Sequence, residues 1–209
     1  MITKLTGTLN RVLDEEVRVQ VGPIEYQVLV PEFVRRQLHL HIGKEVTLST
    51  TQYLEGNQMS NRLVPRLIGF PGDVELEFFD LFCTVDKIGV RKAIKALNRP
   101  IREIADAIQR TDAKWLTTLP GIGPNSAKQV IATLQHKVTK FALMPGLRVD
   151  GEAAPRTSVA PDIIEDAYQA LLSVGHGPAE ARSRLDQILS GGKTFKSAED
   201  VLLAIYAKP

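Results

Sequence analysis

The spacing of the hydrophobic residues changes near residue 75 of this 209-residue chain, and this change limits the possible folds more than any other feature. Before it, Val17 and Val19 alternate with polar residues, which is typical of strands with one buried face. After it, Ile101 and Ile104 begin a stripe at helical spacing. The sequence therefore predicts a β domain that is followed by helical domains.

Four segments follow from these patterns. Residues 1–70 hold a series of short strands, as in a small closed or partly open barrel, with one polar loop that has no periodicity. Residues 71–142 hold four or five short helices in a compact bundle. Residues 143–160 lose all periodicity and are rich in proline and glycine, which predicts a flexible linker. Residues 161–209 predict a three-helix bundle near the lower size limit for independent folding.

The positive charge is concentrated in the second segment. Residues 1–80 carry 8 Lys and Arg against 11 Asp and Glu, residues 81–142 carry 11 against 4, and residues 150–209 carry 6 against 9. A basic block between two acidic ones has two equally good explanations. It is either a binding surface for a polyanionic partner or a helical surface whose charges face the solvent.

Several classes of protein do not fit this composition. No apolar run reaches the ~20 residues of a membrane span, and the N-terminus has no signal-peptide pattern. The single Cys83 rules out an intrachain disulfide framework and a multi-cysteine metal site. We therefore expect a cytoplasmic protein with no membrane partner, no metal and no other cofactor.

The stretch LPGIGP at 119–124 joins two helical patterns by a tight turn. Gly121 and Gly123 permit positive φ and a close approach of the backbone, and the first N–H groups of the next helix have no partner within it. Together with the helix dipole, these amides form an anion site that suits a phosphate. A tight turn without a ligand is the alternative. The full LPGIGPNSA resembles the helix-hairpin-helix family of nonspecific DNA-backbone binders, which implies DNA contacts at Gly121, Ile122, Gly123, Asn125, Ser126 and Lys128.

Residues 85–97, VDKIGVRKAIKAL, repeat this pattern earlier in the chain. Lys87 stands at the first glycine position, where a positive φ would be strained. Arg91 and Lys95 add positive charge on the helix that follows. Two such hairpins would hold neighbouring phosphates of one duplex. The expected DNA contacts of the first hairpin are Lys87, Ile88, Gly89, Val90, Arg91 and Lys92.

The order of these parts resembles the RuvA family of bacterial Holliday-junction-binding proteins over nearly the whole chain. Further matching stretches are MITKLTGTL at the N-terminus, RLIGF at 66–70 and ALLSVGHGPAEA at 170–181. The resemblance implies an OB-like β-barrel, a tandem helix-hairpin-helix domain, a flexible linker and a C-terminal three-helix bundle. It also implies a non-catalytic homotetramer, alone or as two tetramers face to face, that holds four-way DNA junctions flat in recombination and repair. Residues 161–209 would recruit the RuvB ATPase, which pumps DNA through the complex.

In this family an acidic pin on the barrel repels phosphates at the junction centre. The corresponding loop here is longer than usual and offers Glu55, with Gly56 and Asn57 where a second acid is expected. The repulsion is then weaker, or other Asp and Glu side chains supply it. Pro124 and Asn125 stand where the family often has lysines, which predicts fewer ion pairs with DNA and a shallower salt dependence.

Two other functions fit parts of the sequence. Helix-hairpin-helix repair enzymes, such as glycosylases and nuclease relatives, carry similar hairpins, but their glycosylases place a catalytic Asp beyond the hairpin, and residues 139–145 contain no acid. A protein-interaction scaffold whose hairpins bind no DNA is the other alternative. No GxxxxGK[ST] motif for ATP is present, and His39 and His41 have no third metal ligand in view. We therefore expect neither a catalytic residue nor a metal site.

Overall fold

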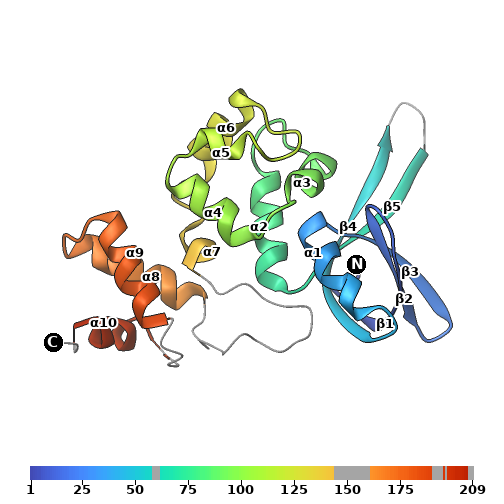
Figure 1. Cartoon of the computed structure of the whole chain (residues 1–209), viewed down its shortest axis with the longest axis horizontal. Coiled ribbons are helices and arrows are strands. Elements are labelled where there is room, and N and C mark those ends of the chain that lie inside the picture. The colour runs from blue at the N-terminus through green and yellow to red at the C-terminus, as the bar shows by residue number, and fades with distance from the viewer. Residues whose placement is uncertain (58–61, 144–160, 190–194, 196, 207–209) are drawn as a thin grey trace.

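The computed structural model describes residues 1–57, 62–143, 161–189, 195 and 197–206. Within these residues, five strands form a closed barrel in the order β1-β2-β3-β5-β4 (Figure 1). The neighbouring strands are antiparallel, except that β3 and β5 are parallel. The strands are β1 (Lys4–Val12), β2 (Glu16–Val21), β3 (Ile24–Leu29), β4 (Glu45–Asn57) and β5 (Arg62–Phe70).

The barrel core is built from the alternating residues that the sequence indicated. Val17 and Val19 on β2 and Val28 on β3 are fully buried. Val21 pairs with Ile24 across a tight turn, and Gly22 in that turn has a φ of 56°, which glycine adopts without strain. The predicted hairpin and barrel are therefore confirmed.

The sequence pattern indicated no helix between β3 and β4, but the chain is helical there. This segment folds into α1 (Glu32–Leu38) and a short 3-10 turn at His39–His41. Val34 and Leu38, one helical turn apart, are fully buried against the barrel. The helix spans only about two turns, so its hydrophobic period is too short to stand out from the sequence.

The predicted polar loop was wrong at both ends, because strands β4 and β5 continue into it. Glu55 pairs with Val64, and Gly56 pairs with Leu63. The resulting β4–β5 hairpin projects beyond the barrel (Figure 1). Strand pairing satisfies backbone groups whatever the polarity of the side chains, so these residues form strands without an alternating pattern.

The second part of the chain is a bundle of short helices that shares one continuous core with the barrel. Phe79 packs its ring against Phe70, the last residue of β5, with 5.1 Å between ring centroids. Ser49 of the barrel donates a hydrogen bond of 2.6 Å to Asp73 at the start of the bundle. The helices are α2 (Asp73–Cys83), α3 (Val90–Ala96), α4 (Ile101–Gln109), α5 (Ala113–Leu116), α6 (Pro124–Leu134) and α7 (Thr139–Leu143).

The third part has a core of its own, which includes Leu171, Leu185 and Val201. It consists of α8 (Pro161–Ser173), α9 (Pro178–Leu189) and α10 (Ala198–Tyr206). The Ser197 hydroxyl accepts a hydrogen bond of 3.2 Å from the backbone N–H of Asp200 and so caps the N-terminus of α10. Of the predicted linker 143–160, Leu143 ends α7, and residues 144–160 lie outside the described residues. None of the helices in the described ranges is long and apolar enough to cross a membrane.

The packing of Phe79 against Phe70 predicts that removal of the Phe79 ring lowers the stability of the protein. Because the Phe79 side chain is 2% exposed, we expect Phe79→Ala to lower the free energy of unfolding by about 3–5 kcal/mol. Urea unfolding followed by the fluorescence of the single Trp115, which packs against the same core, would measure the change. Leu40→Ala is the control, since this leucine lies beside the barrel in the same part of the chain, is 79% exposed, and its loss should change stability by less than about 0.5 kcal/mol. Equal effects of the two variants would contradict the packing described above.

Candidate nucleic-acid interface

The second hairpin, between α5 and α6, has the geometry of an open anion site. Gly121 has a φ of 77°, and Ile122, which is 4% exposed, points into the core. Gly123 precedes α6 in an extended conformation, with φ −88° and ψ 176°, and Pro124 occupies the first turn. No side chain caps this helix, so its first N–H groups remain available to a ligand.

The first hairpin, between α2 and α3, matches the second position by position. Lys87 has a φ of 62°, so a lysine takes the left-handed conformation that Gly121 takes in the other copy. The sequence predicted strain at this position if φ were positive, and such strain costs roughly 1–2 kcal/mol for a non-glycine residue. Ile88 is 3% exposed, and Gly89 precedes α3 in an extended conformation, again without a side-chain cap.

The two hairpins are joined by two hydrogen bonds between their side chains. Lys92 Nζ donates a hydrogen bond of 3.1 Å to the Ser126 hydroxyl, 34 residues further along the chain. Gln129 donates another, of 3.2 Å, to the Asp86 carboxylate. A ligand that contacts one turn is therefore close to the other, as two adjacent phosphates of a DNA strand would require.

The predicted contact residues divide into three groups by burial. Ile88 and Ile122 are buried. Their side chains pack into the core and hold the turns in place, so only their backbone groups can contact a ligand. The half-buried residues are Val90, Lys92 and Ser126. The exposed residues, which can meet a ligand directly, are Lys87, Gly89, Arg91, Gly121, Gly123, Asn125 and Lys128. Their roles in DNA binding stay predictions.

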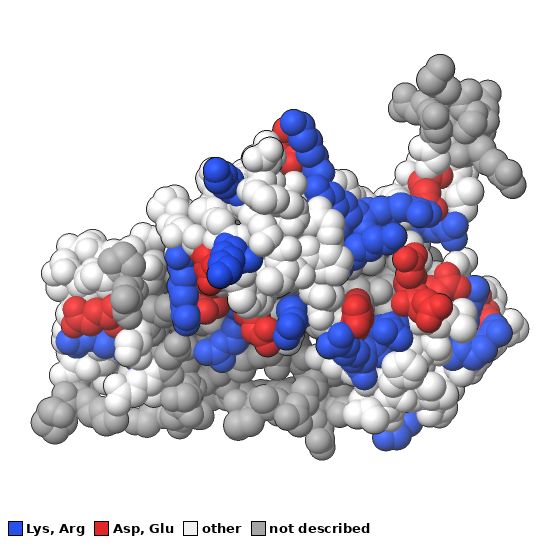
Figure 2. All heavy atoms as spheres, turned by 45° about the horizontal axis from the view of Figure 1, so that its top comes forward, with Lys and Arg blue, Asp and Glu red and all other residues white. Residues whose placement is uncertain are grey.

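Positive charge surrounds this site. In Figure 2, Lys and Arg side chains form a band that ends beside the projecting β4–β5 hairpin, and a group of Asp and Glu side chains lies below it. A cleft of about 450 Å³ between the barrel and α3 contains both kinds of charge. Its lining includes Glu15, Glu32, Glu55, Arg66, Arg91 and Lys95.

Glu55, the predicted junction pin, lies within strand β4 and is paired with cations. Its carboxylate accepts hydrogen bonds from Arg66 Nε at 3.0 Å, from the Tyr53 hydroxyl at 3.1 Å and from Arg91 Nε. The bond from Arg91, followed by those from Arg66 and Tyr53, lowers the pKa of Glu55 to about 2, so the group is ionised at neutral pH. Its role as a pin stays a prediction, because here its charge is balanced by two guanidinium groups.

The sequence reasoning missed Tyr53 and Arg66 as members of this cluster. The period of two on β4 places Tyr53 and Glu55 on one face of the strand. Arg66 lies opposite Tyr53 on β5, but that register follows from the pairing of the two strands.

Comparisons with known proteins agree with this geometry. Residues 1–60 match the RuvA N terminal domain, and residues 79–136 match the SAM-like Helix-hairpin-helix tandem. A protein of Rhodopirellula baltica named Holliday junction branch migration complex subunit RuvA is 46% identical over 208 residues, which are 100% of this chain and 99% of the relative. The chain belongs to the RuvA family.

Another member of the RuvA family, from Desulfatibacillum aliphaticivorans, carries the same name and is 33% identical over 212 residues. The alignment covers 99% of this chain and 98% of that relative. The resemblance read from the sequence and the predicted order of a barrel, a tandem helix-hairpin-helix domain and further helices are confirmed. Among the residues that the structure describes, no group of three or more His, Cys, Asp or Glu side chains could hold a metal ion.

Proposed function

We propose that this chain binds four-way (Holliday) DNA junctions and recruits a RuvB-type ATPase that drives branch migration in recombination and repair. The observation that carries the proposal is the pair of adjacent hairpins, each with an exposed glycine before a helix that no side chain caps. The names of the relatives support it, since both are called subunits of a Holliday junction branch migration complex.

The geometry favours contacts to the DNA backbone. Uncapped helix N-termini bind phosphates through N–H groups and the positive end of the dipole, and neither depends on the base. Exposed Lys87, Arg91 and Lys128 would add ion pairs, which make the affinity fall with salt. The preference of the protein would therefore be for the shape of the junction, because phosphate contacts carry no direct sequence information.

We further propose that the chain acts without chemistry of its own, in the cytoplasm, as a homotetramer or as two tetramers face to face. A flat junction has four equivalent arms, and one chain holds one pair of hairpins, so four copies match four arms. Closed symmetric assemblies of this kind are common among homo-oligomers. The separate core of α8, α9 and α10 supports separate roles for the two parts, in which these helices contact the motor and the hairpins contact DNA.

The proposal predicts a preference for junctions over linear DNA. Because several hairpin pairs engage one junction together, we expect at least about tenfold tighter binding to a four-way junction than to a linear duplex of the same base composition. A gel-shift titration with the parent chain, at low and at physiological ionic strength, measures this ratio. Equal affinities would contradict the proposal. Strand cleavage or base release from a damaged duplex would favour the alternative of a repair enzyme.

A further inference from the structure

Lys92 lies between the first and second hairpins and contacts the turns of both. Its ammonium group donates a hydrogen bond of 3.1 Å to the Ser126 hydroxyl and a longer one, of 3.4 Å, to the backbone carbonyl of Lys87. Its methylene chain runs past the second turn, because a Cβ atom added at Gly121 would lie 3.7 Å from Lys92 Cγ. Lys87 and Gly121 are the residues of positive φ in the two turns. One side chain therefore touches the same bend in both hairpins.

Lys92 and Ser126 occupy the same position in their two helices. α3 begins at Val90 and α6 begins at Pro124, so each residue is the third of its helix. The N–H groups of the first helical turn have no partner within the helix, and they are the groups that would hold a phosphate. The hydrogen bond between Lys92 and Ser126 therefore joins the two candidate phosphate sites directly.

Most of the hydrogen-bonding capacity of Lys92 is already used within the protein. An ammonium group has three donors, and the Ser126 hydroxyl and the Lys87 carbonyl accept from it. Lys92 is also half-buried, whereas the side chains of Lys87, Arg91 and Lys128 are exposed. A phosphate would therefore meet the exposed cations first. Lys92 is better placed to hold the hairpins together than to bind DNA.

Two sites on one DNA strand act together only when their spacing matches the spacing of the phosphates. If the two hairpins moved independently, binding would have to order them and would lose affinity, whereas a site that is rigid beforehand avoids this cost. The bond from Lys92 to Ser126 restricts this motion before DNA arrives. The bond to the Lys87 carbonyl also supports the left-handed bend, which a lysine adopts with strain.

We propose that Lys92 is a positioning residue for DNA binding, which fixes the spacing of the two phosphate sites through Ser126 and the Lys87 carbonyl and does not itself bind a phosphate. The proposal rests on the proposed function and states how two hairpins of one chain act as a single site. Gln129 also donates a hydrogen bond of 3.2 Å from the second hairpin to Asp86 of the first. Loss of Lys92 should therefore loosen the pair of hairpins without separating them.

The test is a double-mutant cycle in the full-length chain, with Lys92→Met, Ser126→Ala and the double variant. We expect each single variant to bind a four-way junction about three- to tenfold more weakly than the parent, because binding must then order the hairpins. The double variant should bind no more weakly than Lys92→Met. Ser126→Thr keeps the hydroxyl and should bind within about 1.5-fold of the parent. Fluorescence anisotropy at one fixed low ionic strength gives the dissociation constants, and circular dichroism verifies that each variant is folded.

A second comparison separates positioning from direct contact with a phosphate. In Gly123→Val the second hairpin is expected to lose its phosphate contact, so the spacing of the two sites no longer matters. Adding Lys92→Met to Gly123→Val should then change the affinity by less than about 1.5-fold. A direct ion pair between Lys92 and a phosphate of the first hairpin would instead persist in this background, and its loss would reduce the salt slope by about 0.9.

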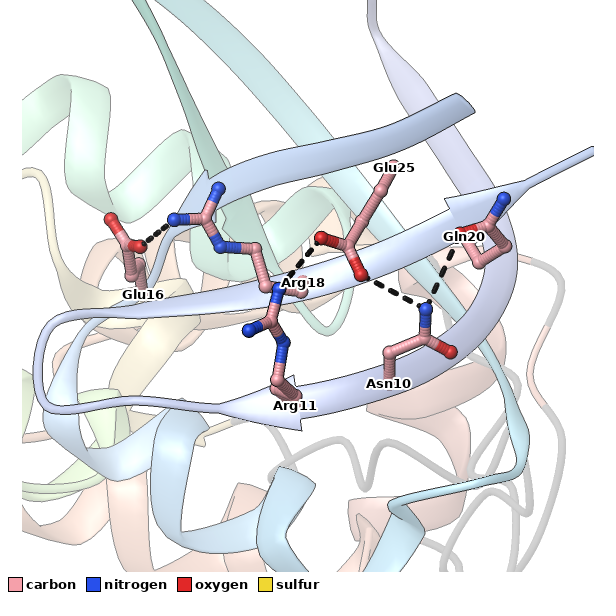
Figure 3. Close-up of polar contacts among 6 residues, drawn as sticks. All are labelled: Asn10, Arg11, Glu16, Arg18, Gln20 and Glu25. Atoms are coloured by element: carbon pink, nitrogen blue, oxygen red, sulfur yellow. Dashed lines mark hydrogen bonds and ion pairs between the residues drawn. The ribbon is translucent and has the colours of Figure 1, made fainter. Parts of the chain in front are cut away.

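A matched control removes a comparable cation from the barrel. Arg11 on β1 donates a hydrogen bond of 2.9 Å to Glu25 on β3, whose carboxylate also accepts one of 3.0 Å from Asn10 (Figure 3). Like Lys92, Arg11 thus joins two separate elements, but both of these are strands of the barrel. Arg11→Met removes the same charge and should leave the affinity within about 1.5-fold of the parent, because this charge is exposed and screened.

Each other result would overturn the positioning role. Parent-like binding by Ser126→Ala, or additive losses in the cycle, would show that the bond between the hairpins does not matter for DNA. A loss that persists in Gly123→Val, or that Arg11→Met reproduces, would show that Lys92 acts through its charge. Should Lys92→Met fail to fold, the contrast between Ser126→Ala and Ser126→Thr decides alone. If the parent binds no junction, the proposed function fails together with this inference, whereas the other results refute the inference alone.

Discussion

Replacing Gly89 and Gly123 together by valine is expected to lower the affinity for a four-way junction by at least about 100-fold, since two central contacts of about 2 kcal/mol each are lost. A Cβ atom added at either glycine would have nothing within 4 Å. Both residues also have extended backbones, with φ of −82° and −88°, which valine adopts readily. The protein itself therefore does not need glycine at these positions, whereas the proposed close contact with a DNA backbone would need it.

The chain offers a matched control for this variant in its C-terminal part. Gly177 also precedes a proline and a helix, α9, and a Cβ atom there would meet nothing within 4 Å. Gly177→Val should therefore leave junction binding unchanged. Gly121→Val is less informative, because its φ of 77° would strain valine and disturb the turn itself. Parent-like binding by the Gly89 and Gly123 double variant would show that the hairpins do not hold DNA.

Deleting residues 158–209 is expected to abolish stimulation of a RuvB-type ATPase and to leave junction binding within about twofold of the parent, because the remaining part holds all the predicted phosphate contacts. The deleted helices have a hydrophobic core of their own, and the barrel and the hairpins share another. Their removal therefore uncovers little of the core beneath the hairpins.

This second prediction is measured with two assays on the same preparations. Gel shifts report junction binding, and ATP hydrolysis by the motor in the presence of junction DNA reports stimulation. A truncated chain that still stimulates the motor would refute the assignment of the C-terminal helices. Loss of both activities would instead show that these helices support the DNA-binding part.

Most of the correct sequence-based predictions came from local patterns, because such patterns depend only on residues that are close together in the chain. The alternation of Val17 and Val19 predicted strands, since a pleated chain turns successive side chains to opposite faces. The turn at Gly121 was predicted because few other residues accept a positive φ. Lys87 is an exception, because it stands at the first glycine position of the repeat and has a φ of 62° although it is not glycine.

The sequence by itself thus determined the order of the parts and both hairpin turns. Only the tertiary structure decided that β3 pairs with β5 to close the barrel, that Lys92 reaches Ser126 and that Glu55 pairs with Arg91, 36 residues later. The physical reason is that periodicity and turn chemistry act over a few residues. Which charges meet depends on how whole elements pack, and a hydrophobic pattern does not record the partner of a polar side chain.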